Sequence, residues 1–157
     1  MLENKRIRKE SGLFVTCIES ILSELSKDSI LQMKNSVKVN DQVVQLVESY
    51  SLNENETIRI ELQCDYNGIS YSGSSLEEFD YALGELEDKM NIKFQVCANC
   101  NNGNITSISD LRHGWHCFRN IENQLTSLAW FERDEEFEES ISNVSALHWC
   151  PKFLIRE

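Results

Sequence analysis

The segment that most constrains the fold is residues 57–66, in which apolar and polar side chains alternate. The apolar side chains occupy every second position, at Ile58, Ile60, Leu62, Cys64 and Tyr66. A period of two places each set on one face of a β-strand, so one face is expected to be buried and the other to meet water. Asn67-Gly68 follows directly and is typical of a two-residue hairpin turn. The pattern therefore predicts that residues 69–72 return antiparallel to this strand.

A capping pattern after the hairpin predicts a helix. Ser74 and Ser75 are each followed three residues later by a glutamate, Glu77 or Glu78, as in a capping box at a helix start. Helical spacing continues through the apolar residues Leu76, Phe79, Leu83, Leu86 and Met90. We therefore expect an amphipathic helix that is capped by one of the two serines.

The remaining segments carry less regular patterns. Strands are expected at residues 13–21, 30–39, 91–96 and 144–149. Asp41 is expected to cap a short helix over residues 43–50, and residues 121–139 are expected to form one or two helices. Together these patterns predict an α+β fold with a largely antiparallel sheet, packed helices and a zinc-knuckle-bearing C-terminal half.

The length and composition predict a single domain, residues 1–157, with two unlike halves. A chain of 157 residues can bury a sizeable core, and no linker or repeat interrupts it. Residues 97–157 contain four of the six cysteines, all three histidines and all three tryptophans. We therefore expect an α+β scaffold over residues 1–96 and a zinc-stabilised, cysteine-bearing half over residues 97–157.

The cysteines of the second half have the spacing of a metal site. Cys97 and Cys100 are separated by two residues, which lets both thiolates reach one ion. Cys117 and Cys150 supply two further thiolates, and Cys150 lies where a terminal strand could return to the first pair. Four thiolates predict a closed, structural zinc site, although the spacing does not distinguish zinc from iron. Cys17 and Cys64 fall on apolar faces and are expected in the core.

Several alternatives for these cysteines stay open. Six cysteines could pair as disulfides, and Cys97 with Cys100 could form a redox pair, although the turn-forming residues 101–104 are unlike the helix that such a pair opens. His116 or His148 could replace one cysteine ligand. A zinc-dependent hydrolase using three of the ligands plus water is the enzymatic alternative. The sequence contains no metalloprotease, deaminase, nucleotide-binding or serine-hydrolase motif, so no catalytic residue is assigned.

The charge balance limits the classes of partner. With 15 Lys and Arg against 26 Asp and Glu, the net charge is −11, which disfavours nucleic acid and favours a basic protein partner. The local exception is the basic cluster between Lys5 and Lys9, which leaves open a nucleic-acid-binding regulator. No apolar run is long enough to cross a membrane, and the charged segment Met1–Glu10 is unlike a secretory signal, so the expected location is the cytoplasm.

Three short motifs resemble those of an uncharacterised family of small bacterial zinc-binding proteins. These are the Cys97–Cys100 pair, the string His116-Cys117-Phe118-Arg119 and the string Trp149-Cys150-Pro151-x-Phe153. The resemblance covers about the last 60 residues and supports the four-cysteine site, but it implies no activity.

The whole chain is also similar in size and charge to acidic α+β immunity proteins encoded beside bacterial toxins. That likeness implies that the acidic residues between Glu132 and Glu139 face a basic toxin surface, where complementary charge would speed the encounter. The leading hypothesis is therefore a non-enzymatic, cytoplasmic protein-interaction domain with a structural zinc, which an immunity-like role would fit.

Overall fold

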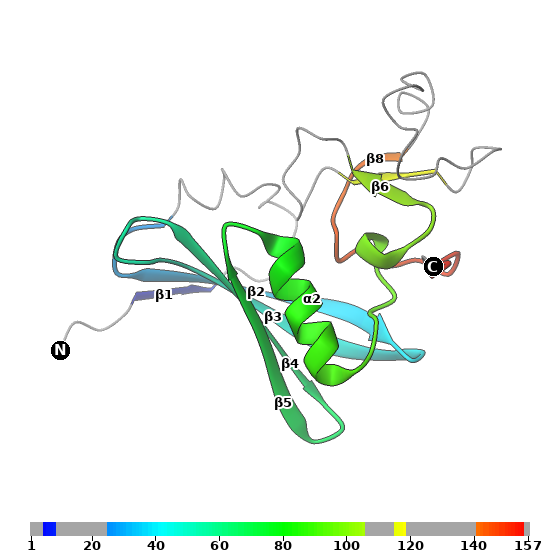
Figure 1. Cartoon of the computed structure of the whole chain (residues 1–157), viewed down its shortest axis with the longest axis horizontal. Coiled ribbons are helices and arrows are strands. Elements are labelled where there is room, and N and C mark those ends of the chain that lie inside the picture. Colours follow the sequence, from blue (N-terminus) through cyan, green and yellow to red (C-terminus); the bar gives the residue numbers. More distant parts are fainter. Residues whose placement is uncertain (1–4, 9–24, 106–114, 119–140, 156–157) are drawn as a thin grey trace.

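The computed structural model describes residues 5–8, 25–105, 115–118 and 141–155 (Figure 1). The elements of the first half are β1 (Lys5–Arg8), β2 (Ser29–Val39), β3 (Gln42–Leu52), β4 (Ile58–Tyr66), β5 (Ile69–Leu76) and α2 (Phe79–Met90). The elements of the second half are the 3-10 turn η1 (Cys97–Asn99), β6 (Gly103–Ile105), β7 (Trp115–Cys117) and β8 (Ile141–Val144).

The strands form two sheets. The larger has the order β1-β2-β3-β4-β5, in which β2 to β5 make an antiparallel meander and β1 pairs with β2 in parallel. The smaller is antiparallel, with the order β6-β7-β8. Figure 1 shows α2 lying across one face of the larger sheet, with the smaller sheet beyond it. We refer to β2–β5 with α2 as the sheet layer, and to residues 97–105, 115–118 and 141–155 as the cysteine-bearing region.

Two-residue turns fix the register of the hairpins in the sheet layer. Asn67 and Gly68 both have positive φ, 52° and 79°, and Tyr66 pairs with Ile69 across them, which confirms the predicted hairpin. Asn40 and Asp41 make an equivalent turn between β2 and β3, with φ of 46° and 62°. Short polar side chains tolerate this left-handed backbone, so the turn closes without glycine.

The helix expected over residues 43–50 is wrong, because this segment is strand β3. Its buried residues are Leu46, Glu48 and Tyr50, which alternate at period two. The buried Glu48 hides this alternation from an apolar pattern, while Val43, Val44 and Val47 supply a coincidental helical spacing. Branching at Cβ favours the strand for these valines.

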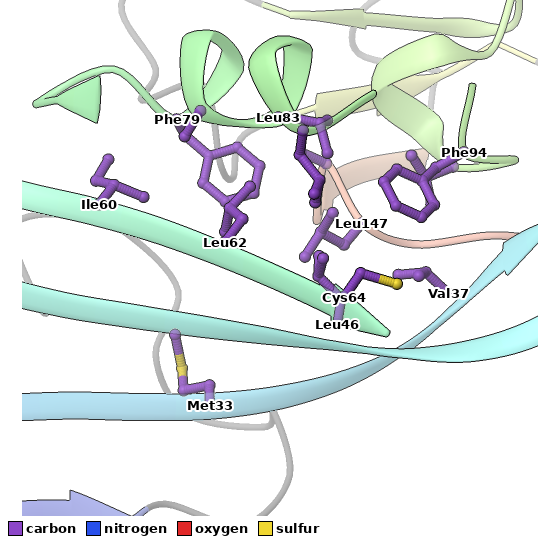
Figure 2. Close-up of a cluster of buried hydrophobic side chains, with 14 of the residues drawn as sticks. Met33, Val37, Leu46, Ile60, Leu62, Cys64, Phe79, Leu83, Phe94 and Leu147 are labelled. Atoms are coloured by element: carbon purple, nitrogen blue, oxygen red, sulfur yellow. The ribbon is translucent and has the colours of Figure 1, made fainter. Parts of the chain in front are cut away.

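The core lies between the sheet and α2. Ile60 and Leu62 of β4 are completely buried, as the alternation predicted, and Cys64 is 1% exposed. Figure 2 shows Phe79 and Leu83 of α2 pointing toward these β4 side chains, and it shows Leu147 entering the same cluster. Apolar burial of this kind stabilises by about 25 cal/mol for each Å² removed from water. Cys64 is thus a core residue, as expected, whereas Cys17 lies outside the described residues.

Helix α2 begins later than its capping pattern predicted. β5 continues through Leu76, which pairs with Arg59, and the N-cap of α2 is Glu78 without a side-chain capping bond. The Ser75 hydroxyl instead donates to the carbonyl of Glu78. The serine caps and the helical placement of Leu76 are therefore wrong, while burial of Phe79, Leu83, Leu86 and Met90 is confirmed. Pairing with β4 satisfies the backbone hydrogen-bonding groups of residues 74–76, which a helix starting at the serines would have used instead.

A glycine in β5 lets the helix approach the sheet. A Cβ at Gly73 would overlap the carbonyl oxygen of Ala82 and lie 2.6 Å from the amide nitrogen of Leu86. The backbone of β5 therefore lies directly against α2. In contrast, Gly84 within α2 has no atom within 4 Å of such a Cβ.

The predicted α+β fold with packed helices is wrong for the part of the chain described. That part is mostly antiparallel sheet, with α2 as its single α-helix. The segment 91–96, expected as a strand, is irregular. Of the strand expected at 144–149, only Val144 is in a strand, as the last residue of β8, and a turn and irregular backbone follow it. The expected strand at 30–39 is confirmed as β2. The elements expected at 13–21 and 121–139 lie outside the described residues.

Candidate metal centre

The four cysteines of the predicted metal site come from three separate segments of the cysteine-bearing region. Cys97 begins η1, Cys100 follows its end, Cys117 is the last residue of β7, and Cys150 follows the turn after β8. Cys97 and Cys100 are buried, whereas Cys117 and Cys150 are partly exposed. All four are thiols that are not joined in disulfides.

Backbone hydrogen bonds hold these segments side by side. The N–H of Cys97 donates to the carbonyl of His148 at 2.7 Å, which brings the segment before Cys150 against η1. Gly103 of β6 pairs with Cys117 of β7, and Cys100 bridges to Ile155. Each cysteine is therefore within or next to a backbone contact to another part of the region.

The Cys97–Gly103 segment is a tight double turn. The N–H of Cys100 donates to the carbonyl of Cys97 at 3.2 Å, and the N–H of Gly103 donates to the carbonyl of Cys100 at 3.0 Å. A Cβ at Gly103 would overlap the carbonyl oxygen of Cys97, so any other residue would push this turn open. The sequence Asn101-Asn102-Gly103 was expected to be a turn for its composition, and the close approach explains why glycine ends it.

A second turn follows Cys150. The N–H of Phe153 donates to the carbonyl of Cys150 at 3.2 Å, across Pro151 and Lys152. The Asn102 side chain donates to the carbonyl of Lys152 at 3.4 Å, and the N–H of Phe118 donates to the carbonyl of Asn102 at 2.8 Å. Asn102 is 4% exposed and connects the turn after Cys100 with both other cysteine segments.

The four cysteines line one small cavity of about 40 Å³. Its other lining residues are Asn102, Gly103, Val144 and His148. Among the described residues, no three His, Cys, Asp or Glu side chains are arranged to share a metal ion. The fold thus brings the predicted ligands to a common cavity, and ligation of one ion by all four requires their thiols to draw closer within it.

The histidines beside these cysteines differ in their surroundings. His148 is exposed and lines the cavity, so it stays an alternative to a cysteine ligand. His116 is half-buried, its ring lies 6.4 Å from that of Phe118, and burial lowers the pKa of its imidazole. His113 lies outside the described residues.

A buried carboxylate that the sequence did not single out connects α2 to the Cys97–Cys100 turn. Glu87 is 2% exposed, and its carboxylate accepts hydrogen bonds from the N–H of Phe94 at 3.0 Å and from the side-chain amide of Asn99. Lys93 pairs with the other carboxylate oxygen at 2.8 Å. Charge pairing and hydrogen bonds together offset the cost of burying this carboxylate. No periodic pattern marks it, because its partners come from the irregular segment after α2.

The region also docks on the larger sheet through Trp149. Its indole N–H donates to the carbonyl of Ser36 in β2 at 3.2 Å, and the Lys38 ammonium lies 5.6 Å from the indole centroid. Leu147 and Ala146 enter the core beside it. The tryptophan next to Cys150 therefore packs against β2.

Comparison with known proteins found no matching family model, curated protein or solved structure. The family resemblance of the cysteine motifs therefore stays a prediction. Within the described residues, no helix is both long and apolar enough to cross a membrane.

Proposed function

We propose that this chain is a non-enzymatic protein-interaction domain in which Cys97, Cys100, Cys117 and Cys150 bind a structural zinc ion. The observation that carries the proposal is the cavity of about 40 Å³ that all four cysteines line, although they come from three segments. Two turns and a network of backbone bonds converge on it. Convergence of four thiols is costly to build without a crosslink, because each segment must be ordered separately.

The donor chemistry fits zinc. Four thiolates form the tetrahedral set typical of structural zinc, and none of these cysteines is occupied in a disulfide. The thiols would draw together around the ion and lose their protons on binding. Because Cys117 and Cys150 are partly exposed, their side chains are the ones expected to move toward the buried Cys97 and Cys100.

The size of the cavity favours a structural over a catalytic metal. A volume of about 40 Å³ holds an ion or a few water molecules, whereas ligand sites usually occupy about 300–1,000 Å³. A hydrolase needs room beside its metal for water and substrate. The closed site therefore supports the structural role.

The partner class follows from charge. A net charge of −11 favours a basic protein partner through faster encounter and correct orientation. An immunity-like inhibitor of a basic toxin is the narrower form of this proposal, and it rests on the resemblance in size and charge. The acidic residues 132–139, which that form invokes, lie outside the described residues.

Elemental mass spectrometry on protein purified without chelator tests the zinc site. We expect about one zinc per chain, and we expect Cys150→Ser to reduce zinc content strongly. Cys64→Ala is the matched control, since it removes a cysteine from the core without touching the site. Absence of metal in the wild-type protein would overturn the proposal, and full zinc retention by Cys150→Ser would favour the three-ligand alternative.

A further inference from the structure

An open groove of about 730 Å³, which has no role in the proposed metal site, lies at the C-terminal end of the cysteine-bearing region. Three parts of the chain form it: the β2–β3 turn, the C-terminal end of α2 with residues 91–95, and residues 153–155. Its volume falls in the range of ordinary binding sites, which is about 300–1,000 Å³. It is far larger than the cavity between the cysteines.

Part of the groove lining is acidic. Asp41 and Asp88 are both exposed at it, while Glu87 and Lys93, which also line it, are paired with each other. The groove also receives the C-terminal end of α2, where the helix dipole is negative. Asp88 has no ion pair among the described residues, whereas Asp41 contacts Lys38 at 3.3 Å. A cationic group would therefore be favoured beside Asp88.

Another part of the lining is aliphatic. Leu154 is 53% exposed and Ile155 is 57% exposed, which places them among the most exposed large apolar side chains described. Phe153 and Ile92, which also line the groove, are half-buried. Exposed apolar surface in a groove with a polar rim is typical of a protein-binding site.

We propose that this groove binds a basic segment of a partner protein, with lysine or arginine side chains against Asp41 and Asp88 and aliphatic side chains against Leu154 and Ile155. Charge complementarity selects this occupant, because an acidic or purely apolar segment would leave the exposed Asp88 carboxylate without a counter-charge. The inference rests on the proposed function in its partner class, and it adds the surface where that partner binds.

The metal site and the groove share one wall. Cys150 is three residues before Phe153, and the carbonyl of Leu154 accepts a hydrogen bond from the N–H of Asn101 at 2.6 Å, one residue after Cys100. Zinc bound by Cys100 and Cys150 would thus fix both ends of the segment that presents Leu154 and Ile155. Groove binding is then expected to weaken on chelation.

The test uses a short synthetic peptide of lysine and leucine, with two comparison peptides that replace either its lysines by glutamate or its leucines by serine. Binding is followed by fluorescence anisotropy at low and moderate salt, and mapped by amide chemical shifts of the full-length protein. We expect the lysine–leucine peptide to bind best and to shift residues 40–41, 87–95 and 153–155. Equal binding of the glutamate peptide, no binding, or shifts confined to the outer face of the sheet would overturn the proposal.

Variants separate the groove from general attraction by an acidic protein. Asp88→Lys is expected to weaken binding about tenfold through like-charge repulsion, and Leu154→Ser is expected to weaken it through lost apolar contact. Glu61→Lys is the matched control. Glu61 is exposed on β4, outside the groove, and its substitution changes the net charge by the same amount. An equal loss of affinity in Asp88→Lys and Glu61→Lys would show attraction by net charge alone and contradict the inference.

Zinc content is measured in the same samples, so that the two proposals can fail separately. Groove-localised binding by a protein without metal would leave this inference standing and overturn the zinc site. One zinc per chain with no groove-localised binding would do the reverse.

Discussion

The sheet layer and the cysteine-bearing region are stabilised in different ways. In the sheet layer, long strands and α2 bury a continuous set of apolar side chains, including Leu46, Ile60, Leu62 and Phe79, all completely buried. In the cysteine-bearing region, the strands have three or four residues, and backbone hydrogen bonds join the turns between them. Its described buried residues include Trp115, Phe118 and Leu147, of which Trp115 and Leu147 belong to the main core.

This difference indicates where a metal would matter. Short strands with few buried side chains of their own gain little from burial, and each ordered residue costs about 1–2 kcal/mol of backbone entropy. A crosslink between the segments offsets that cost, whereas the sheet layer needs none. The two regions should therefore respond differently to metal removal and to core substitutions.

The largest effect is expected from removal of zinc. Chelation of the zinc-loaded protein should abolish amide-exchange protection in the cysteine-bearing region and leave protection in β3 and β4, because structural zinc in small domains contributes about 10–16 kcal/mol. Hydrogen exchange before and after chelation measures this, with readdition of zinc as the control. Equal loss of protection in both regions would break the comparison drawn here.

A core substitution should instead destabilise the sheet layer. Leu62→Ala is expected to lower the free energy of unfolding by about 3 kcal/mol, since it leaves a cavity beneath α2. Urea unfolding of the zinc-loaded protein measures the change. Gln63→Ala, one residue along on the exposed face, should change stability by less than about 0.5 kcal/mol. Similar losses from both would contradict the burial pattern of β4.

Alanine substitution at two glycines should change the free energy of unfolding in opposite directions. Gly73→Ala is expected to cost about 2 kcal/mol, because its Cβ would push α2 away from β5. Gly84→Ala should gain up to about 1 kcal/mol, since the site is open and alanine is the better helix former. Thermal unfolding of the two variants side by side measures both. A neutral Gly73→Ala would mean that α2 does not need its close approach to β5.

Glu87 connects the two regions, and its substitution tests whether they are coupled. Glu87→Gln is expected to cost about 1–3 kcal/mol, because the Lys93 pair is lost and the bonds to Phe94 and Asn99 weaken. Asp88→Asn, exposed on the same helix, is the control and should be near neutral. Glu87→Gln should also retain zinc more weakly, because its partner Asn99 lies inside the Cys97–Cys100 turn. Competition with a chelator measures this. Unchanged zinc retention would confine Glu87 to the sheet layer.

The smallest effect concerns pH. The Lys89 ammonium and the N–H of Ser74 hold the pKa of the Glu85 carboxyl below its ordinary value of 4.5. A lowered pKa in the folded state stabilises above about pH 4.5 and loses that contribution as the pH falls through the folded pKa. Glu85→Gln should therefore be less stable than the wild type at pH 7, with the difference shrinking in acid. Urea midpoints of both proteins, measured at pH 7 and at an acidic pH, test this, and a difference that grew in acid would contradict it.

The sequence predicted elements whose information is local. The alternation in β4 and the Asn67-Gly68 turn were confirmed because side-chain period and turn chemistry act within a few residues. β3 was mistaken for a helix because Glu48, a polar residue, is buried on its core face beside Met33 and Leu62. Only the neighbouring strands decide that a carboxylate can be accommodated there, with Asn35 donating to it at 3.1 Å.

The candidate site divides in the same way. Spacing selected Cys97 and Cys100, because two intervening residues limit how far apart two thiols can lie. Cys117 and Cys150 were added as the other thiols of the second half, with Cys150 expected on a strand that returns to the first pair. Their common cavity depends on the carbonyl of His148, the Asn102 side chain and the bridge at Ile155, which join residues distant in sequence. The groove beside them also required tertiary structure, since Asp41, Asp88 and Leu154 come from three separate elements. The sequence by itself determined the residue types and the local turns, and the tertiary structure decided which of them meet, because long-range contacts depend on how whole elements pack.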